Sequence, residues 1–254
     1  MAKTAFITGA TSGIGLATAK ALAEKGYNLG LAARRKEALQ KVRYEIMSAY
    51  PMSVEIYPLD VRDEKNIKKV ADSYISACGA PDVLVNNAGL ARGLEPYERT
   101  DTDDIRQMID TNIKGLFLVT RAFLPSMLKR NEGHIVNLGS TAGLYAYAGA
   151  AVYCATKAAV KTFSDGIRID TIDSNLKVTT IQPGIVHTPF SEIRFHGDKK
   201  RADAVYEGIE ALEAEDIADI IAFAVTRKRR VQISDIVIMA NQQATGFMVS
   251  KHKK

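Results

Sequence analysis

The regular alternation of short apolar runs with longer helical patterns constrains the fold more than any other feature of this chain. Runs such as 4–8 (TAFIT) and 82–86 (DVLVN) have the length and composition of buried strands. Amphipathic segments such as 14–25 and 36–49 separate consecutive runs. Strands joined through a helix run parallel, so the pattern predicts a parallel sheet with helices on both faces.

The complete pattern indicates one domain. We expect strands at 4–8, 28–33, 53–57, 82–86, 134–138, 177–181 and 233–239, and helices at 14–25, 36–49, 64–77, 101–110, 112–130, 150–174 and 215–226. No repeat or linker divides the 254 residues. The chain is therefore predicted to be an α/β protein, a single doubly wound Rossmann-fold domain over 1–254. The polar stretch 187–214 has the character of a substrate loop or lid, and 241–254 forms a tail.

The composition excludes several classes of protein. Apolar residues make up 46% of the chain and charged residues 25%, as in an ordinary globular protein. No apolar run reaches the ~20 residues of a membrane span, and the first residues, MAKTAFITGA, lack a signal-peptide pattern. We therefore expect a cytoplasmic protein without a membrane partner. The four histidines and two cysteines are scattered, so we expect no metal site.

Part of the net charge of +5 lies in two basic clusters, 227–230 and 251–254. Such clusters suit either a nucleic-acid surface or a helix end and a frayed tail. No DNA-binding motif or aromatic platform accompanies them, so we favour the second interpretation and expect no nucleic-acid partner. The tail either docks on a neighbouring subunit or stays disordered; the sequence leaves this open.

A glycine-rich turn, TGATSGIG at 8–15, joins the first expected strand to the first expected helix. Glycines let the backbone approach a pyrophosphate, whose charge is favourable at a helix N-terminus. The spacing is GxxxGxG, where the usual dinucleotide motif is GxGxxG. The turn therefore indicates a dinucleotide site by its position as much as by its pattern.

The end of the second expected strand indicates which dinucleotide binds. An acidic residue here accepts hydrogen bonds from a ribose 2′-hydroxyl, but this chain has Ala33, Arg34 and Arg35. Guanidinium groups suit a 2′-phosphate by charge and by geometry. We therefore predict NADP(H), the alternative being a solvated arginine pair at the start of a helix.

A possible catalytic group lies in the stretch 137–159, which contains Ser140, Tyr153 and Lys157. Tyr153 and Lys157 are four residues apart, so both lie on one face of a helix. A tyrosine and a lysine at this spacing often occur together by chance. The pair therefore indicates a catalytic site only if the chain also has a cofactor site.

Seven motifs in one order carry a family resemblance. They are TGATSGIG at 8–15, Asp60-Val61, Asn86-Asn87-Ala88-Gly89, Asn112, Ser140, Tyr153-x-x-x-Lys157 and Pro183-Gly184. Over nearly its whole length the chain resembles the short-chain dehydrogenase/reductase family. NNAGLARGLEP, MIDTNIKG, NLGSTAG and the segment 190–198 resemble, within that family, the NADP-dependent branch that oxidises 3-hydroxy acids, serine and allo-threonine.

The resemblance assigns roles to individual residues. Ser140 holds the substrate oxygen, Tyr153 is the acid/base, Lys157 contacts the nicotinamide ribose and biases the tyrosine, and Asn112 anchors a water that relays protons to Lys157. With the arginine pair, the expected cofactor-binding residues are Gly9, Thr11, Ser12, Gly13, Ile14, Gly15, Arg34, Arg35, Asp60, Val61, Asn87, Ala88, Gly89, Tyr153, Lys157, Pro183, Gly184, Val186 and Thr188. Asn87, Gly89 and Asn112 have an alternative, purely structural interpretation.

The resemblance also implies broad substrate use and a homotetramer. Ser140, Tyr153 and Arg194 are the expected substrate-binding residues, and Arg194 would pair with a substrate carboxylate. Arg92 is the second candidate for that contact, and the alternative for either residue is a solvated arginine in a loop. Tyr145 and Tyr147 either form walls of the pocket or pack in the core.

The leading hypothesis is an NADP-dependent oxidoreductase for small 3-hydroxy acids or β-hydroxy amino acids such as serine. A reductase of bulkier ketones or 3-oxoacyl compounds is the alternative within the family. A non-catalytic NADP-binding regulator is a third possibility, but it has no chemical need for Asn112, Ser140, Tyr153 and Lys157 together. The sequence leaves the physiological substrate, its stereochemistry and the reaction direction open.

Overall fold

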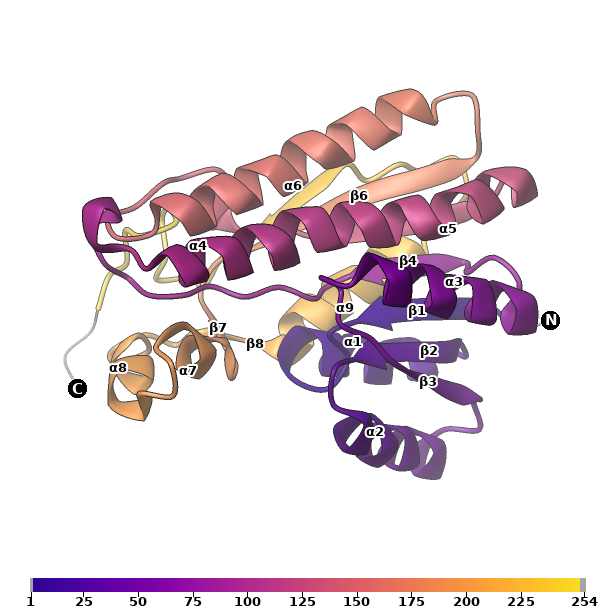
Figure 1. Cartoon of the computed structure of the whole chain (residues 1–254), viewed down its shortest axis with the longest axis horizontal. Coiled ribbons are helices and arrows are strands. Elements are labelled where there is room, and N and C mark those ends of the chain that lie inside the picture. Colours follow the sequence, from indigo (N-terminus) through magenta and orange to yellow (C-terminus); the bar gives the residue numbers. More distant parts are fainter. Residues whose placement is uncertain (1, 252–254) are drawn as a thin grey trace.

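A seven-stranded parallel sheet forms the centre of the computed structural model, which describes residues 2–251 (Figure 1). The strand order is β3-β2-β1-β4-β5-β6-β9. The strands are β1 (Thr4–Thr8), β2 (Asn28–Ala33), β3 (Val54–Pro58), β4 (Val83–Asn86), β5 (Gly133–Leu138), β6 (Leu176–Pro183) and β9 (Asp235–Ile238). The chain starts at β1, moves to β3 at one edge and returns to β4 beside β1. This is the doubly wound arrangement that the sequence predicts.

Helices cover both faces of the sheet. They are α1 (Gly13–Glu24), α2 (Lys36–Ala49), α3 (Glu64–Cys78), α4 (Thr102–Ile109), α5 (Leu116–Arg130), α6 (Ala151–Asp170) and α9 (Ala214–Val225). The core residues of α1, α2 and α9 pack with one side of the sheet, and those of α3 and α5 pack with the other. Within β1, Ala5 and Ile7 belong to the first cluster and Phe6 to the second, because successive side chains of a strand point to opposite faces.

The structure differs from the predicted elements in three places. The expected break between 101–110 and 112–130 is wrong, because a π-helical segment, Asp110–Gly115, joins α4 to α5 without interruption. The expected helix 150–174 ends at Asp170, where a turn follows. The polar stretch 187–214 contains two short helices, α7 (Phe190–Arg194) and α8 (Lys199–Ala204), between the two-residue strands β7 (Val186–His187) and β8 (Leu212–Glu213). Figure 1 shows α7 and α8 projecting beside the main body.

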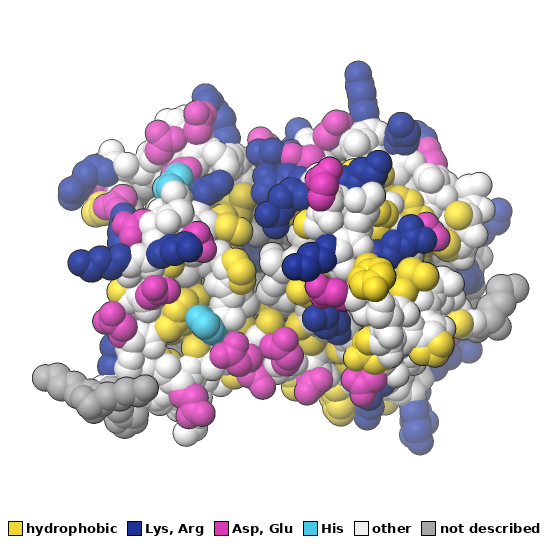
Figure 2. All heavy atoms as spheres, turned by 90° about the horizontal axis from the view of Figure 1, so that it is seen from below, with side chains coloured by type: hydrophobic (Ala, Val, Ile, Leu, Met, Phe, Trp, Pro, Cys, Tyr) yellow, Lys and Arg dark blue, Asp and Glu magenta, His cyan; other side chains and the backbone are white. Residues whose placement is uncertain are grey.

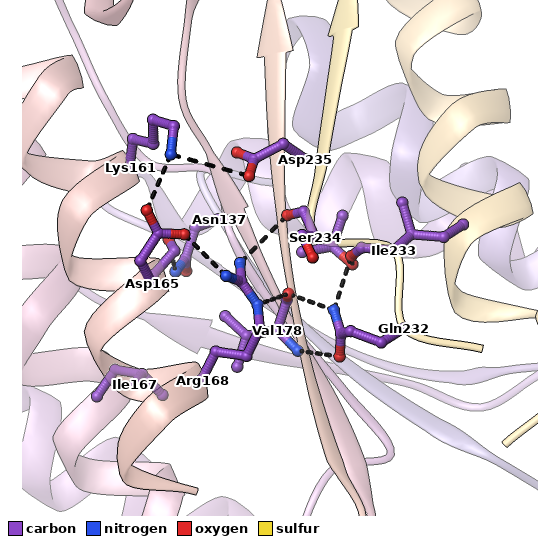
Figure 3. Close-up of polar contacts among 12 residues, drawn as sticks. Asn137, Lys161, Asp165, Ile167, Arg168, Val178, Gln232, Ile233, Ser234 and Asp235 are labelled. Carbon is purple, nitrogen blue, oxygen red and sulfur yellow. Dashed lines mark hydrogen bonds and ion pairs between the residues drawn. The ribbon is translucent and has the colours of Figure 1, made fainter. Parts of the chain in front are cut away.

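The edge strand β9 is held to α6 and β6 by polar side chains (Figure 3). Lys161 Nζ is 2.8 Å from Asp165 and 4.0 Å from Asp235, and Arg168 Nη1 is 2.8 Å from Asp165. The Gln232 side chain accepts from the Val178 backbone N–H and donates to its carbonyl. These contacts hold the C-terminal half of α6, residues 161–168, against the edge of the sheet. Between residues 2 and 251, no helix is long and apolar enough to cross a membrane.

Candidate active site

A cavity of about 530 Å³ opens at the carboxyl ends of the parallel strands. Its walls come from the ends of β1, β2, β4, β5 and β6 and from the segment that carries α7 and α8. Figure 2 shows a hollow near the middle of the face seen from below, bordered by Lys and Arg side chains. Crevices at this point of a doubly wound sheet are the usual ligand sites, because the strand order reverses there.

The glycine-rich turn forms one wall of this cavity. Gly9 and Gly13 have φ of +67° and +51°, in the left-handed region that side chains disfavour. Gly15 does not line the cavity: it packs inside the turn, where a Cβ would collide with the Gly9 carbonyl oxygen. Asn87 Nδ2 donates to the carbonyls of Thr8 (2.9 Å) and Gly9 (3.1 Å) and so holds the turn in place. The remaining predicted residues of this wall, Thr11, Ser12 and Ile14, all face the cavity.

Three arginines border the end of the cavity at β2 and β3. Arg34 and Arg35 follow β2, as the sequence predicts, and Arg62 is the third. Arg62 forms a bidentate contact with Asp60, at 2.6 and 3.1 Å to Oδ2 and 3.0 Å to Oδ1. This contact holds the pKa of Asp60 below its usual range, and Arg34 adds to the effect. Arg62 was not predicted, although its place directly after Asp60-Val61 was an available signal.

The Ser140 and Tyr153 side chains meet at the opposite end of the cavity. Tyr153 is 8% exposed, and burial raises its pKa well above the ordinary value. The neighbouring Tyr147 adds to this rise, whereas Arg194 and a hydrogen bond from Ser140 oppose it. The Ser140 Oγ atom also accepts from the backbone N–H of Ala142 at 3.1 Å, which orients it.

Lys157 lies one helical turn after Tyr153 and is buried. Its Nζ atom donates to the Leu138 carbonyl at 2.7 Å and is 5.9 Å from the centroid of the Tyr153 ring. Within residues 2–251, no carboxylate lies within 4.0 Å of it. Burial without an opposite charge lowers the pKa of Lys157 to about 8. The spacing predicted from the sequence therefore places a desolvated cation next to the phenol.

Asn112 lies in the π-helical segment and does not line the cavity. Its Oδ1 atom accepts from the Leu90 N–H at 2.9 Å, and its Nδ2 atom donates to the Leu90 carbonyl and to Thr156. The side chain therefore supports the loop that follows Gly89 and the helix that carries Tyr153. π-Helical turns of this kind occur mostly at functional sites.

The turn after β6 forms the wall beside Ser140. Pro183, Gly184, Val186 and Thr188, which the sequence predicts to bind the cofactor, line the cavity. Gln243 was not predicted: its Oε1 atom accepts from the Ile185 N–H at 2.9 Å, and its side chain occupies the place where a Cβ of Gly184 would lie. No sequence motif signals Gln243, because only the tertiary fold brings the tail to this turn.

Arg194 and Arg92, the two candidates for contact with a substrate carboxylate, have different surroundings in the structure. Arg194, at the end of α7, lines the cavity, and its Cζ atom is 5.3 Å from the centroid of the Tyr153 ring. Arg92 does not line it: its Nη atoms donate to the Ile193 carbonyl at 2.6 Å and to Gln107 at 3.2 Å. Tyr147 is a wall of the cavity, whereas Tyr145 is not.

The fold and the site together define a class of protein. The family model for short chain dehydrogenases matches residues 3–199. The chain belongs to the short-chain dehydrogenase/reductase family.

Particular relatives are similar over almost the whole chain. An NADP-dependent 3-hydroxy acid dehydrogenase of Schizosaccharomyces pombe is 44% identical over 242 residues, covering 95% of this chain and 93% of the relative. The NADP-dependent 3-hydroxy acid dehydrogenase YdfG of Escherichia coli K12 is 40% identical over 240 residues, with coverage of 94% and 95%.

Two solved structures share the fold closely. The closed form of serine dehydrogenase complexed with NADP+ superposes with a TM-score of 0.91 at 38% identity, covering 99% of this chain and 100% of that one. Serine dehydrogenase from Escherichia coli gives a TM-score of 0.82 at 36% identity, covering 95% and 99%. These neighbours agree with the single-domain Rossmann-type fold.

Proposed function

We propose that this protein is an NADP-dependent oxidoreductase that moves a hydride between the nicotinamide and the alcohol carbon of a small 3-hydroxy acid or β-hydroxy amino acid. One observation carries the proposal: a single cavity has Ser140, Tyr153 and Lys157 at one end and Arg34 and Arg35 at the other. The names of the relatives, which include NADP-dependent 3-hydroxy acid dehydrogenases and a serine dehydrogenase, support it.

The residues at the cavity fit NADP. At the N-terminus of α1, the cap residue Ser12 makes no side-chain bond to the helix, which leaves the first backbone N–H groups for a pyrophosphate. Arg34 and Arg35 line the cavity and would pair with the 2′-phosphate, and Arg62 binds the Asp60 carboxylate nearby. When bound, NADP+ accepts the hydride. The cofactor would carry the hydride, and the residues of this chain would move the proton.

Tyr153 takes the alcohol proton in this proposal. A free tyrosine has a pKa of about 10, so only about one in a thousand is ionised at pH 7. Burial raises the pKa of Tyr153 further in the protein without ligands. Positive charges lower the pKa of a phenol. Arg194 and Lys157 are the cations beside Tyr153, and an oxidised nicotinamide ring would add a third positive charge when bound. In the reducing direction, the same hydroxyl returns the proton to the substrate oxygen.

Ser140 and Asn112 support this proton transfer. The Ser140 hydroxyl hydrogen-bonds the substrate oxygen, where negative charge develops. Asn112 orders the Leu90 backbone and Thr156 beside Lys157, and by family resemblance it also anchors a water that connects Lys157 to solvent.

The substrate end suits an anion. Arg194 supplies the cation, and Phe190, 5.7 Å from the Tyr153 ring between centroids, supplies an apolar wall. We assign Arg194 to the substrate carboxylate. The segment 187–214, with α7 and α8, serves as the lid in this proposal, since it brings Arg194 to Tyr153.

Turnover of a substrate panel tests the proposed function. We expect NADP+ reduction with 3-hydroxybutyrate, serine and allo-threonine, and much slower reduction with bulky secondary alcohols. Exclusive activity on bulky alcohols or 3-oxoacyl compounds would favour the alternative within the family. NADP(H) binding without any turnover would favour the regulator.

The cofactor preference has its own test. Arg34→Ala with Arg35→Ala removes two phosphate-binding cations, so NADPH affinity should fall about a hundredfold while NADH affinity changes little. Fluorescence titration with both nucleotides measures this. An unchanged preference for NADP over NAD would contradict the assignment.

A homotetramer remains part of the proposal. The family resemblance supports it, as do exposed apolar side chains on α6, α9 and β9, namely Ile169 (71%), Phe223 (48%) and Val237 (44%). Light scattering measures the mass directly, and a monomer would refute this part.

A further inference from the structure

A hydrogen bond between Arg194 and Tyr147 lies at the substrate end of the cavity. The Arg194 Nη2 atom donates to the Tyr147 hydroxyl oxygen at 2.9 Å, and the guanidinium carbon is 5.7 Å from the centroid of the Tyr147 ring. Both side chains line the cavity. The two residues come from different elements, the turn before α6 and the end of α7, so the bond joins the catalytic helix to the proposed lid.

Arg194 has no other polar partner for its side chain in the described structure. Its Nε atom is buried without a hydrogen-bond acceptor among residues 2–251, and none of their carboxylates lies within 4.0 Å of the guanidinium. A buried donor without an acceptor is costly, more so when it carries charge. The carboxylate of a substrate is an acceptor of the required charge and shape.

Arg92 shows the contrast. Its Nε atom is also buried without an acceptor among residues 2–251, so the difference lies at the Nη atoms. Both Nη atoms of Arg92 are bonded to protein groups, one of them the carbonyl of Ile193, the residue directly before Arg194. The Arg194 carbonyl in turn accepts from the Gly93 N–H at 2.9 Å. The backbone of Arg194 is therefore fixed by the loop after β4, and only its long side chain still needs an anchor.

Tyr147 is well placed to be that anchor. Its carbonyl accepts from the Ala150 N–H at 3.3 Å, at the start of α6, and its ring packs against the cluster that contains Tyr153 and Leu90. A free arginine side chain has about 2 kcal/mol of rotamer entropy to lose on binding. A partner that orders it before the substrate arrives removes part of this cost.

We propose that Tyr147 is a specificity-determining positioning residue: its hydroxyl holds the Arg194 guanidinium beside Tyr153, where it selects substrates that carry a carboxylate. This inference rests on the proposed function. The Tyr147 hydroxyl takes no part in proton transfer. Its loss should therefore raise KM for an acid. Any change in kcat, through the contribution of Tyr147 to the pKa of Tyr153, should be the same for the acid and for a neutral analogue.

The experiment compares 3-hydroxybutyrate with its methyl ester, using NADP+, in wild type, Tyr147→Phe, Arg194→Ala and the double variant. Tyr147→Phe keeps the ring and removes only the hydroxyl. We expect KM for the acid to rise about tenfold, the value for losing one hydrogen bond to a charged group. KM for the ester should stay within about twofold of wild type, and any change in kcat should be the same for both substrates. Arg194→Ala should cost about a hundredfold in kcat/KM for the acid, and the double variant no more than that.

Tyr145→Phe is the matched control, because Tyr145 is 40% exposed and lies outside the cavity lining. It should match wild type with both substrates. Melting temperature and NADPH affinity, measured for every variant, report structural damage independently of the carboxylate.

The outcomes separate the inference from the function on which it rests. If Tyr147→Phe costs acid and ester equally, or costs neither while Arg194→Ala discriminates between them, the positioning role is wrong and the carboxylate contact stands. If Arg194→Ala costs both substrates equally, the carboxylate contact and the inference both fail. If wild type turns over neither substrate, the proposed function itself fails.

Discussion

Two lysines one turn apart on α6 have opposite electrostatic environments. Lys157 is buried, donates to a backbone carbonyl and has a pKa lowered to about 8 by desolvation. Lys161 is about a third exposed, and its hydrogen bond to Asp165 raises its pKa (Figure 3). The N-terminal half of α6 therefore holds a cation, Lys157, that has no carboxylate partner. Further along the helix, Lys161 forms an ion pair with Asp165. Only the unpaired charge is available to a phenol or to a ligand.

Tyr153→Phe should have the largest effect, because it removes the proposed proton carrier, which lies beside the unpaired Lys157. We expect kcat to fall about a thousandfold, the scale of a lost general base. NADPH affinity, measured by fluorescence, should stay within threefold of wild type. Turnover within tenfold of wild type would show that Tyr153 does not transfer the proton.

Lys157→Met should lower the activity of the protein but raise its free energy of unfolding. Turnover at pH 7 should fall about a hundredfold, since the cation beside Tyr153 is lost. The pKa of Lys157 is about 8 in the folded protein against an ordinary value of 10.5, so below pH 8 its burial as a cation costs stability.

The same variant should therefore raise the free energy of unfolding at pH 7 by about 1 kcal/mol, after the lost bond to Leu138 is subtracted. Urea denaturation measures this. In wild type, the stability should also rise with pH between about 8 and 10.5, and the variant should lose that rise. A variant less stable than wild type at pH 7 would contradict the interpretation.

His134 extends the comparison to a second buried group without an opposite charge. Thr179 Oγ1 donates to the Ile233 carbonyl at 2.6 Å, so the His134 Nε2 atom must donate to Thr179, at 2.7 Å. Its Nδ1 atom is buried and has no partner among residues 2–251. Burial lowers the pKa of His134 to about 3, and nearby Lys177 adds to the shift.

Since the unfolded chain binds this proton near pH 6.5, stability should fall as the pH drops below that value, by up to about 1.4 kcal/mol per unit. His134→Gln should lose this decline between pH 6.5 and 5, measured by urea denaturation. His187→Gln, at an exposed histidine, is the control and should keep the decline. An unchanged slope in His134→Gln would mean that other groups cause the decline.

Lys161→Met should have the smallest effect. Partly exposed ion pairs contribute about 0.5 kcal/mol, and salt screens them. We expect a loss of that size in unfolding free energy, reduced at high salt, with kcat and KM within twofold of wild type. A large loss of activity would show that the two lysines are not as different as their surroundings indicate.

The sequence alone determined the architecture and picked out many of the residues that line the cavity. The strand and helix periods follow from local burial patterns, so the seven strands were predicted to within a few residues. The glycine turn, the arginine pair and the Tyr153–Lys157 spacing are local too: each depends on the geometry of one turn or one helix. These residues were therefore recognisable before the fold was known.

The tertiary structure decided the contacts between segments far apart in the chain. Residues 110 and 243 illustrate this: the π-helical segment that begins at Asp110 forms against Leu90 and Val61, and Gln243 reaches Ile185 from the tail. The choice between Arg92 and Arg194 is of the same kind. Both are arginines in loops near the site, and only packing shows that Ile193 and Gln107 bind the first, whereas the second faces the cavity. The charge of a side chain and its spacing from its neighbours can be read from the sequence. Whether the side chain is buried, and which groups it contacts, depends on segments that only the folded chain brings together.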